Sequence, residues 1–106
     1  MPEVAAKSAG TDKLAGRVRV EFFGVPRRRA GVAFFELELD AGETNLGQVL
    51  AELARHLPDF GAACLNEGAL RADYVASLNG DRFVRDLATP LLPGSLLLIL
   101  SADAGG

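Results

Sequence analysis

Gly105 and Gly106, the last two residues of the sequence, are the ones whose type and position suggest chemistry. At a background glycine frequency of about 7%, two terminal glycines arise by chance in roughly one chain in 200. Glycine has no Cβ, so a Gly-Gly end can adopt conformations closed to other residues and can approach a binding surface closely. Such a tail could thread a narrow channel and bring the carboxylate of Gly106 to a remote active site. The alternative is a frayed, glycine-rich end.

Few other side chains could carry chemistry. Cys64 and His56 are the only cysteine and histidine, which excludes a disulfide framework, a structural zinc site and a plant-type iron–sulfur cluster. We therefore expect no metal and no bound cofactor. Cys64 is expected to be a small buried residue rather than a sulfur relay, and His56 a surface residue late in a helix. Since no nucleophile–base pair or phosphate-binding loop is visible, a self-contained enzyme is disfavoured.

The composition indicates one soluble domain. The 106 residues are 49% hydrophobic, enough for a single modest core. A net charge of −3 argues against a nucleic-acid partner, because there is no basic surplus to neutralise phosphates. No segment approaches the roughly 20 apolar residues that cross a bilayer, and the N-terminus lacks the pattern of a signal peptide. The sequence therefore predicts a cytoplasmic protein without a membrane partner.

The elements that would position the tail follow from hydrophobic periodicity. Residues 1–16 show no sustained period and are interpreted as a flexible leader before a domain at 17–106. Residues 17–23 and 32–40 alternate as strands of a hairpin, joined by a turn-rich loop over 24–31. The outer-face acids of the second strand, Glu36 and Glu38, are expected to be solvated.

One amphipathic helix is predicted after the hairpin. Apolar residues at helical spacing run from Leu46 to Leu57, with Thr44 as the cap or, alternatively, Asn45 paired with Gln48. Pro58 ends the helix. The rest of the chain is expected to contain an irregular segment over 59–72, strands over 74–78 and 82–84 joined at Asn79-Gly80, and a final strand over 96–100.

The predicted order is thus ββαβββ. A single amphipathic helix can cover one face of a mixed sheet of four to five strands, which gives a two-layer α+β domain. This arrangement is that of the β-grasp, or ubiquitin-like, fold.

Several short motifs, in order, resemble the MoaD/ThiS family of ubiquitin-like sulfur carriers. This family includes the small subunit of molybdopterin synthase and carriers for thiamin and cysteine biosynthesis. The resemblance covers about Val18 to Gly106. The residues that carry it are Val20-Glu21-Phe22-Phe23, Arg27, Gly31, Thr44, Leu46, Leu78-Asn79, Leu91-Leu92-Pro93-Gly94-Ser95 and the final Gly-Gly.

The resemblance implies that Gly106 is the working residue. In the family, a ubiquitin-activating-like adenylyltransferase consumes ATP to adenylate the terminal carboxylate, and a sulfur donor then converts it to a thiocarboxylate. Asp103, Ala104 and Gly105 would accordingly lie in the partner's channel. The protein would be a co-substrate or small subunit rather than an enzyme in its own right.

The resemblance also implies a docking surface on the final strand. Counted back from the diglycine, Leu98 and Leu100 face outward and Leu97 and Ile99 enter the core, a choice that the apolar pattern alone leaves open. Arg27 occupies a position found in the family and could contact the partner or an anionic substrate. The adjacent arginines fit a solvated hairpin tip.

The pathway stays open at this stage. The segment between helix and third strand favours a molybdopterin synthase small subunit, whose partner would be the large subunit, over a minimal thiamin carrier. A cysteine-type carrier with another sulfur-accepting enzyme, a ubiquitin-like modifier, and a β-grasp interaction module without tail chemistry are the alternatives. Ser95 and Ser101 stand where family members often carry an acidic residue and a proline.

Overall fold

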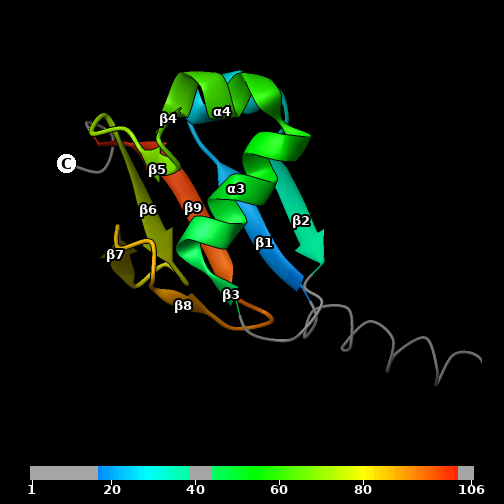
Figure 1. The fold of residues 1–106 in the computed structure, drawn as a ribbon, viewed down its shortest axis with the longest axis vertical. Helices are drawn as coiled ribbons and strands as arrows, with labels where there is room; N and C mark the ends of the chain where they lie inside the picture. Colours follow the sequence, from blue (N-terminus) through cyan, green and yellow to red (C-terminus); the bar gives the residue numbers. More distant parts are fainter. Residues whose placement is uncertain (1–16, 39–43, 103–106) are drawn as a thin grey trace, which may run out of the picture.

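A five-stranded mixed sheet covered on one face by helices is the centre of the fold (Figure 1). The structure, a computed structural model, describes residues 17–38 and 44–102. The sheet strands are β1 (Arg17–Phe22), β2 (Phe34–Glu38), β6 (Tyr74–Leu78), β7 (Arg82–Val84) and β9 (Leu96–Ser101). The helices are α2 (Val25–Ala30), α3 (Leu46–His56) and α4 (Pro58–Cys64). Two-residue strands form two small ladders, β3 (Thr44–Asn45) with β8 (Pro90–Leu91) and β4 (Leu65–Asn66) with β5 (Ala69–Leu70).

The final strand lies in the middle of the sheet, whose order is β2-β1-β9-β6-β7. Strand β9 runs parallel to β1, with Val20 opposite Leu97, and antiparallel to β6, with Ala76 opposite Ile99. The β1–β2 and β6–β7 pairs are antiparallel. The α+β, β-grasp class predicted from the sequence is therefore confirmed.

The predicted amphipathic helix is α3, which lies across the inner face of the sheet (Figure 1). It begins with the alternative cap: Asn45 Oδ1 accepts from the backbone N–H of Gln48 at 2.8 Å, and Gln48 Oε1 accepts from that of Asn45 at 3.1 Å. This reciprocal pair satisfies two donors that a helix start leaves free. Thr44 is not the cap, because it lies in β3 and its hydroxyl donates to Gln48 Oε1.

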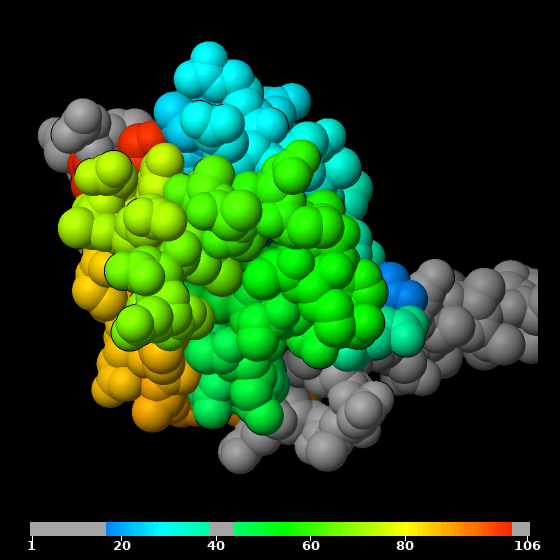
Figure 2. All heavy atoms as spheres, turned by 45° about the horizontal axis from the view of Figure 1, so that its top comes forward, coloured from blue at the N-terminus to red at the C-terminus, as the bar shows by residue number. Residues whose placement is uncertain are grey.

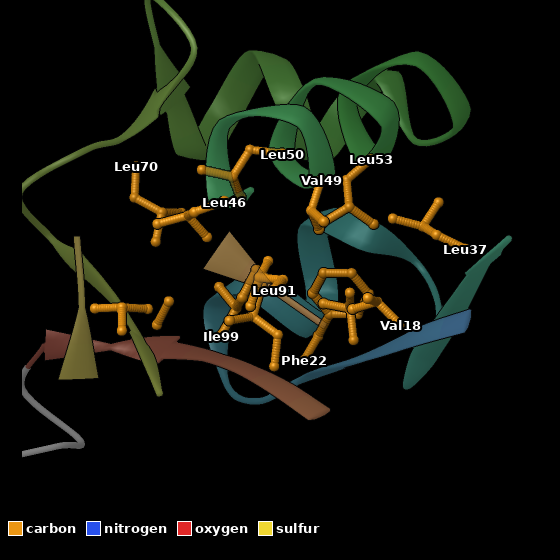
Figure 3. Packing of buried hydrophobic residues seen from close by; sticks show 14 of the residues in the cluster. Val18, Phe22, Leu37, Leu46, Val49, Leu50, Leu53, Leu70, Leu91 and Ile99 are labelled. Carbon is orange, nitrogen blue, oxygen red and sulfur yellow. The ribbon is translucent and has the colours of Figure 1, made fainter. Parts of the chain in front are cut away.

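The core lies between α3 and the sheet (Figure 3). The inner-face residues Val18, Val20 and Phe22 of β1 are buried, as the alternation predicts. Phe22 packs edge-on against Phe60 of α4, with ring centroids 5.2 Å apart. The side chains of α3 that face the sheet are Leu46, Val49, Leu50 and Leu53, all fully buried.

Two segments that the sequence analysis treats as irregular are helical. The connection over 24–31 contains α2, with Pro26 in its first turn and Gly31 as a left-handed C-cap at φ 79°. Pro58 does end α3, but it also begins α4. Proline is well suited to a first helical turn, where its missing N–H would have no partner. The sequence analysis predicted one helix, whereas the described residues contain three. The predicted helix is present as α3.

The remaining predicted elements of the second half are confirmed. Strands β6 and β7 have the predicted bounds, and their connection begins with Asn79 and Gly80 at φ 56° and 76°. The irregular segment also contains the small β4–β5 hairpin, with Glu67 and Gly68 at positive φ in its turn. The leader over 1–16 and Leu39 lie outside the described residues.

Candidate functional site

The place where the chain leaves the sheet is defined by main-chain hydrogen bonds at the end of β9. Ser101 is still paired with Tyr74 of β6. One residue on, the backbone N–H of Ala102 donates to the carbonyl of Asp73 at 2.7 Å. We call Ser101 and Ala102 the tail root. The four residues predicted to act in or beside the partner, Asp103, Ala104, Gly105 and Gly106, lie outside the described residues.

Strand β9 presents opposite faces to the core and to the outside. Leu97 and Ile99 have no exposed surface, as expected, and lie in the core. Leu98 and Leu100 therefore point to the outer face of the sheet, where they are half-buried. The helices lie on the other face, so the described chain leaves this side of β9 partly open.

Around Leu98 and Leu100 the outer face is apolar. Val75 of β6 pairs with Leu100, and Phe83 of β7, 63% exposed, pairs with Ser77 next to Leu98. Phe23, 43% exposed, follows β1 and donates its N–H to the carbonyl of Ile99. We call Phe23, Val75, Phe83, Leu98 and Leu100 the outer apolar surface. It adjoins the tail root, so a protein that receives the tail would meet it.

The other half of the outer face is mainly charged, and its exposed aromatic ring, Phe34, lies under the Arg19 guanidinium at 3.8 Å. Arg17 donates to Glu36 at 3.0 Å and to Glu38 at 2.8 Å, and Arg19 donates to Glu21 at 2.8 Å and to Glu36 at 3.2 Å. These pairs are exposed enough to be screened by solvent, so they contribute little to stability. The guanidinium and carboxylate groups neutralise one another, so this half of the outer face offers a partner protein fewer unpaired charges.

Arg27 is exposed and lies on α2, not at a hairpin tip. Helix α2 packs beside the end of β9, and a Cβ placed on Gly24, its N-cap, would be 3.8 Å from Ser101 Oγ. Helix α2 thus brings Arg27, together with Arg28 and Arg29, to the same end of the molecule as the tail root.

Cys64 and His56 behave as expected. Cys64 has no exposed surface, and burial raises the pKa of its thiol, while a hydrogen bond with Tyr74 acts in the opposite direction. A protonated, buried thiol is a poor nucleophile. His56 is exposed, and its Nε2 lies 3.5 Å from a carboxylate oxygen of Glu52 on the same helix.

Within residues 17–38 and 44–102, no three metal-ligating side chains gather into a cluster. No helix in that part of the chain is long and apolar enough to span a membrane.

The sequence analysis missed three members of the outer apolar surface. Val75 and Phe83 could have been found, because alternation along 74–78 and 82–84 separates them from Ala76 and Val84, which are buried. Phe23 carried no such signal, since it follows the alternating run and begins the connection to the next strand.

Comparison with known proteins identifies solved structures with the same fold. No protein-family model and no curated protein sequence matches the chain. The crystal structure of SAMP1 from Haloferax volcanii matches with a TM-score of 0.72 and 21% identity, over 86% of this chain and 100% of that one. SAMP1, small archaeal modifier protein 1, from Methanosarcina acetivorans matches with a TM-score of 0.66 and 21% identity, over 86% of this chain and 97% of that one.

A third similar structure is that of a putative molybdopterin converting factor, subunit 1, from Pyrococcus furiosus. Its TM-score is 0.65 and its identity 25%, over 80% of this chain and 95% of that one. These structures confirm the predicted resemblance to MoaD/ThiS-type β-grasp proteins at the level of fold. Because each is covered almost completely, the likeness extends over the whole domain.

Proposed function

We propose that this chain, which has the β-grasp fold of small modifier proteins and of a putative molybdopterin converting factor subunit, is a ubiquitin-like carrier. Its working group in this proposal is the carboxylate of Gly106. The observation that supports the proposal most is the outer apolar surface beside the tail root. A protein that docks there would receive the tail directly from the central strand.

The chemistry in the proposal starts from an unreactive carboxylate. Attack on it would have to expel oxide or hydroxide, which are poor leaving groups. In an ATP-dependent activating enzyme, the carboxylate oxygen attacks the α-phosphorus of ATP and pyrophosphate leaves. The resulting acyl-adenylate expels AMP when a sulfur donor delivers sulfide at the acyl carbon. The product is a thiocarboxylate whose terminal sulfur can attack an electrophile in a sulfur-accepting enzyme.

We favour molybdopterin synthesis as the destination of the sulfur, with the large subunit of molybdopterin synthase as the acceptor. The support is the Pyrococcus furiosus structure, that of a putative molybdopterin converting factor, subunit 1. Cysteine and thiamin biosynthesis use carriers of the same design and stay as alternatives.

A second candidate function is protein modification, favoured by the likeness to small archaeal modifier proteins. In this case the activated Gly106 carbonyl would be attacked by a lysine amine of a target, with loss of the activating group. Up to the adenylate the two functions use the same chemistry. They differ in the product, which is a thiocarboxylate in one and an isopeptide bond in the other.

The experiment that tests the proposal is the mass of the intact protein after incubation with ATP, a sulfur source and extract of the native host. A gain equal to the replacement of one oxygen by sulfur is expected. Deletion of Gly106 should abolish it, and so should extra residues after Gly106, which remove the glycine carboxylate.

The controls separate the alternatives. A diglycine carrier known to be charged by the same extract shows that the reagents are active. If that carrier gains mass and this chain does not, the sulfur-carrier function is wrong. A ladder of larger species that contain the chain, lost on deletion of Gly106, would favour the modifier.

A further inference from the structure

A group of arginines lies at the same end of the molecule as the tail root. Arg27, Arg28 and Arg29 are exposed on α2, which packs against both α4 and the end of β9. Arg71 lies at the end of α4: its backbone N–H donates to the carbonyl of Cys64 at 2.9 Å. Figure 2 shows α2 in cyan projecting beside the yellow-green segment around residue 71 and the red end of β9.

Arg29 and Arg71 come from segments that meet at α4: α2 packs on this helix, and Arg71 is hydrogen-bonded to its last residue, Cys64. Both arginines lower the pKa of the buried Cys64 thiol through their charge, although burial raises it overall. Arg71 also donates to the carbonyl of Ala62 at 3.5 Å. The four arginines are therefore a local cluster, contributed by α2 and by the segment after β5.

The arginines of this cluster form no ion pair within the described part of the chain. The ion pairs found there involve Arg17, Arg19, Arg55 and His56, and none involves an arginine of the cluster. Asp73 adjoins the tail root through its backbone carbonyl and influences Tyr74 through its charge, and Asp103 follows the tail root directly in the sequence. The net charge of the whole chain is nevertheless −3, so the positive end of the molecule is a local feature.

We propose that Arg27, Arg28, Arg29 and Arg71 form a cationic docking patch that binds a carboxylate-lined rim on the activating enzyme, at the entrance that admits the tail. This inference rests on the proposed function and adds the second half of the docking surface to it. The outer apolar surface lies on one side of the tail root and the cationic patch on another. Together they would fix the direction in which the tail enters.

The length of the tail argues for a protein rim rather than the nucleotide. The four residues after Ala102 span about 13 Å when extended. The phosphates that react at Gly106 would lie at the far end of that span, while the arginines stay at its base. The arginines therefore face the surface of the partner protein around the entrance that admits the tail. An overall acidic chain is a poor binder of nucleic acid, which leaves an acidic protein surface as the occupant that the charge fits.

The choice of cation suits a site near an activated acyl group. Every cationic side chain from Arg17 onward is an arginine, and both lysines, Lys7 and Lys13, come earlier. A lysine amine can be acylated, whereas an arginine stays protonated at all working pH values and binds carboxylates through two parallel N–H donors. A patch made of arginine can dock beside the reaction without reacting.

The test uses the activating enzyme purified from the same organism and the full chain. Adenylation of Gly106 is followed as exchange of pyrophosphate into ATP, and KM and kcat are measured for the chain. The variant is Arg27→Glu/Arg28→Glu. The matched control, Arg55→Glu/Arg82→Glu, changes the net charge equally at exposed positions elsewhere. Unchanged circular dichroism and melting temperature show that both variants fold.

In about 50 mM salt we expect the patch variant to raise KM about tenfold or more with kcat unchanged. The difference should shrink to less than about twofold near 500 mM salt, because exposed charges are then screened. The control should stay within about twofold of wild type. Arg28→Gln, which removes one charge without reversing it, should give a smaller rise in KM.

Three results would overturn the inference. An unchanged KM would show that the patch does not dock on the enzyme, and an equal rise in both variants would assign the effect to net charge. Loss of binding to an RNA 20-mer or to phosphatidylserine vesicles, with KM unchanged, would assign the patch to another polyanion. Failure of the proposed function would give a different result: the wild-type chain itself would support no exchange of pyrophosphate into ATP. The docking inference would then fail as well, because the patch would have no activating enzyme to bind.

Discussion

The close approach of α3 and α4 at Gly61 leads to a prediction whose sign differs from that of simple helix propensity. Gly61 is inside α4, where alanine normally stabilises a helix by about 1 kcal/mol relative to glycine. Here a Cβ on Gly61 would lie 2.7 Å from the Cβ of Ala54 on α3 and 3.1 Å from its Cα. The obstacle is next to the backbone, so no side-chain rotation removes it.

The magnitude follows from the overlap. To restore an ordinary carbon–carbon contact, the two helices must separate by about 0.7 Å or more. Overpacking of this kind costs about 1–3 kcal/mol. After the gain in propensity is subtracted, Gly61→Ala should lower the free energy of unfolding by up to about 2 kcal/mol. For a domain of this size, that lowers the melting temperature by up to about 10 °C.

The assay is urea and thermal unfolding followed by circular dichroism, with a double-mutant cycle as the control. In an Ala54→Gly background the 2.7 Å overlap with the Cβ is gone and only the 3.1 Å contact with the Cα remains, so Gly61→Ala should there be close to neutral or stabilise the protein by up to about 1 kcal/mol. The coupling energy between the two positions should then be about 1–3 kcal/mol. A higher melting temperature for Gly61→Ala alone, or additive effects of the two substitutions, would refute the close approach.

Three further predictions concern the cap, the outer face and the thiol. Asn45→Ala removes half of the capping box and should cost about 1 kcal/mol in urea unfolding. Leu100→Asp should change stability by less than about 1 kcal/mol yet raise the KM for the activating enzyme, whereas Leu97→Ala in the core should cost about 2–5 kcal/mol. Because burial raises the pKa of Cys64, the unfolded thiol ionises first as the pH rises through its ordinary value of 9.0, so the free energy of unfolding should fall above this pH. Urea midpoints measured up to pH 10.5 should fall less steeply in Cys64→Ala.

The sequence predicted the elements whose signals are long or chemically specific. Strict alternation located β1, helical spacing over eleven residues located α3, and Asn79-Gly80 located the β6–β7 turn. In these segments local preference and burial agree, so the pattern suffices.

The two short helices could not be found in the same way. Helix α2 has six residues and α4 has seven, too few turns for a hydrophobic period to develop. Pro26 and Pro58 looked like breaks, although each is at the start of a helix. What makes these segments helical is tertiary packing, such as that of Phe60 on Phe22, which joins residues far apart in the sequence.

The orientation of β9 shows the same limit at the candidate site. Five consecutive apolar residues, Leu96 to Leu100, give no indication of which face is inward. The resemblance to sulfur carriers supplied the choice, and pairing with β1 and β6 explains it physically. The arginines of α2 were visible as a charged run, but their position beside the tail root depends on how α2 folds back against β9.

The central position of β9 also bears on the order of events during synthesis. Strand β1 is synthesised long before its parallel partner, since Arg19 pairs with Leu96, 77 residues further along the chain. Until β9 is made, the sheet exists only as separate hairpins, and the places of Leu97 and Ile99 in the core are empty. A chain interrupted before β9 cannot close its core and stays open to proteolysis. Folding therefore requires β9, so a chain that has reached its native state already holds the strand that leads to the tail root.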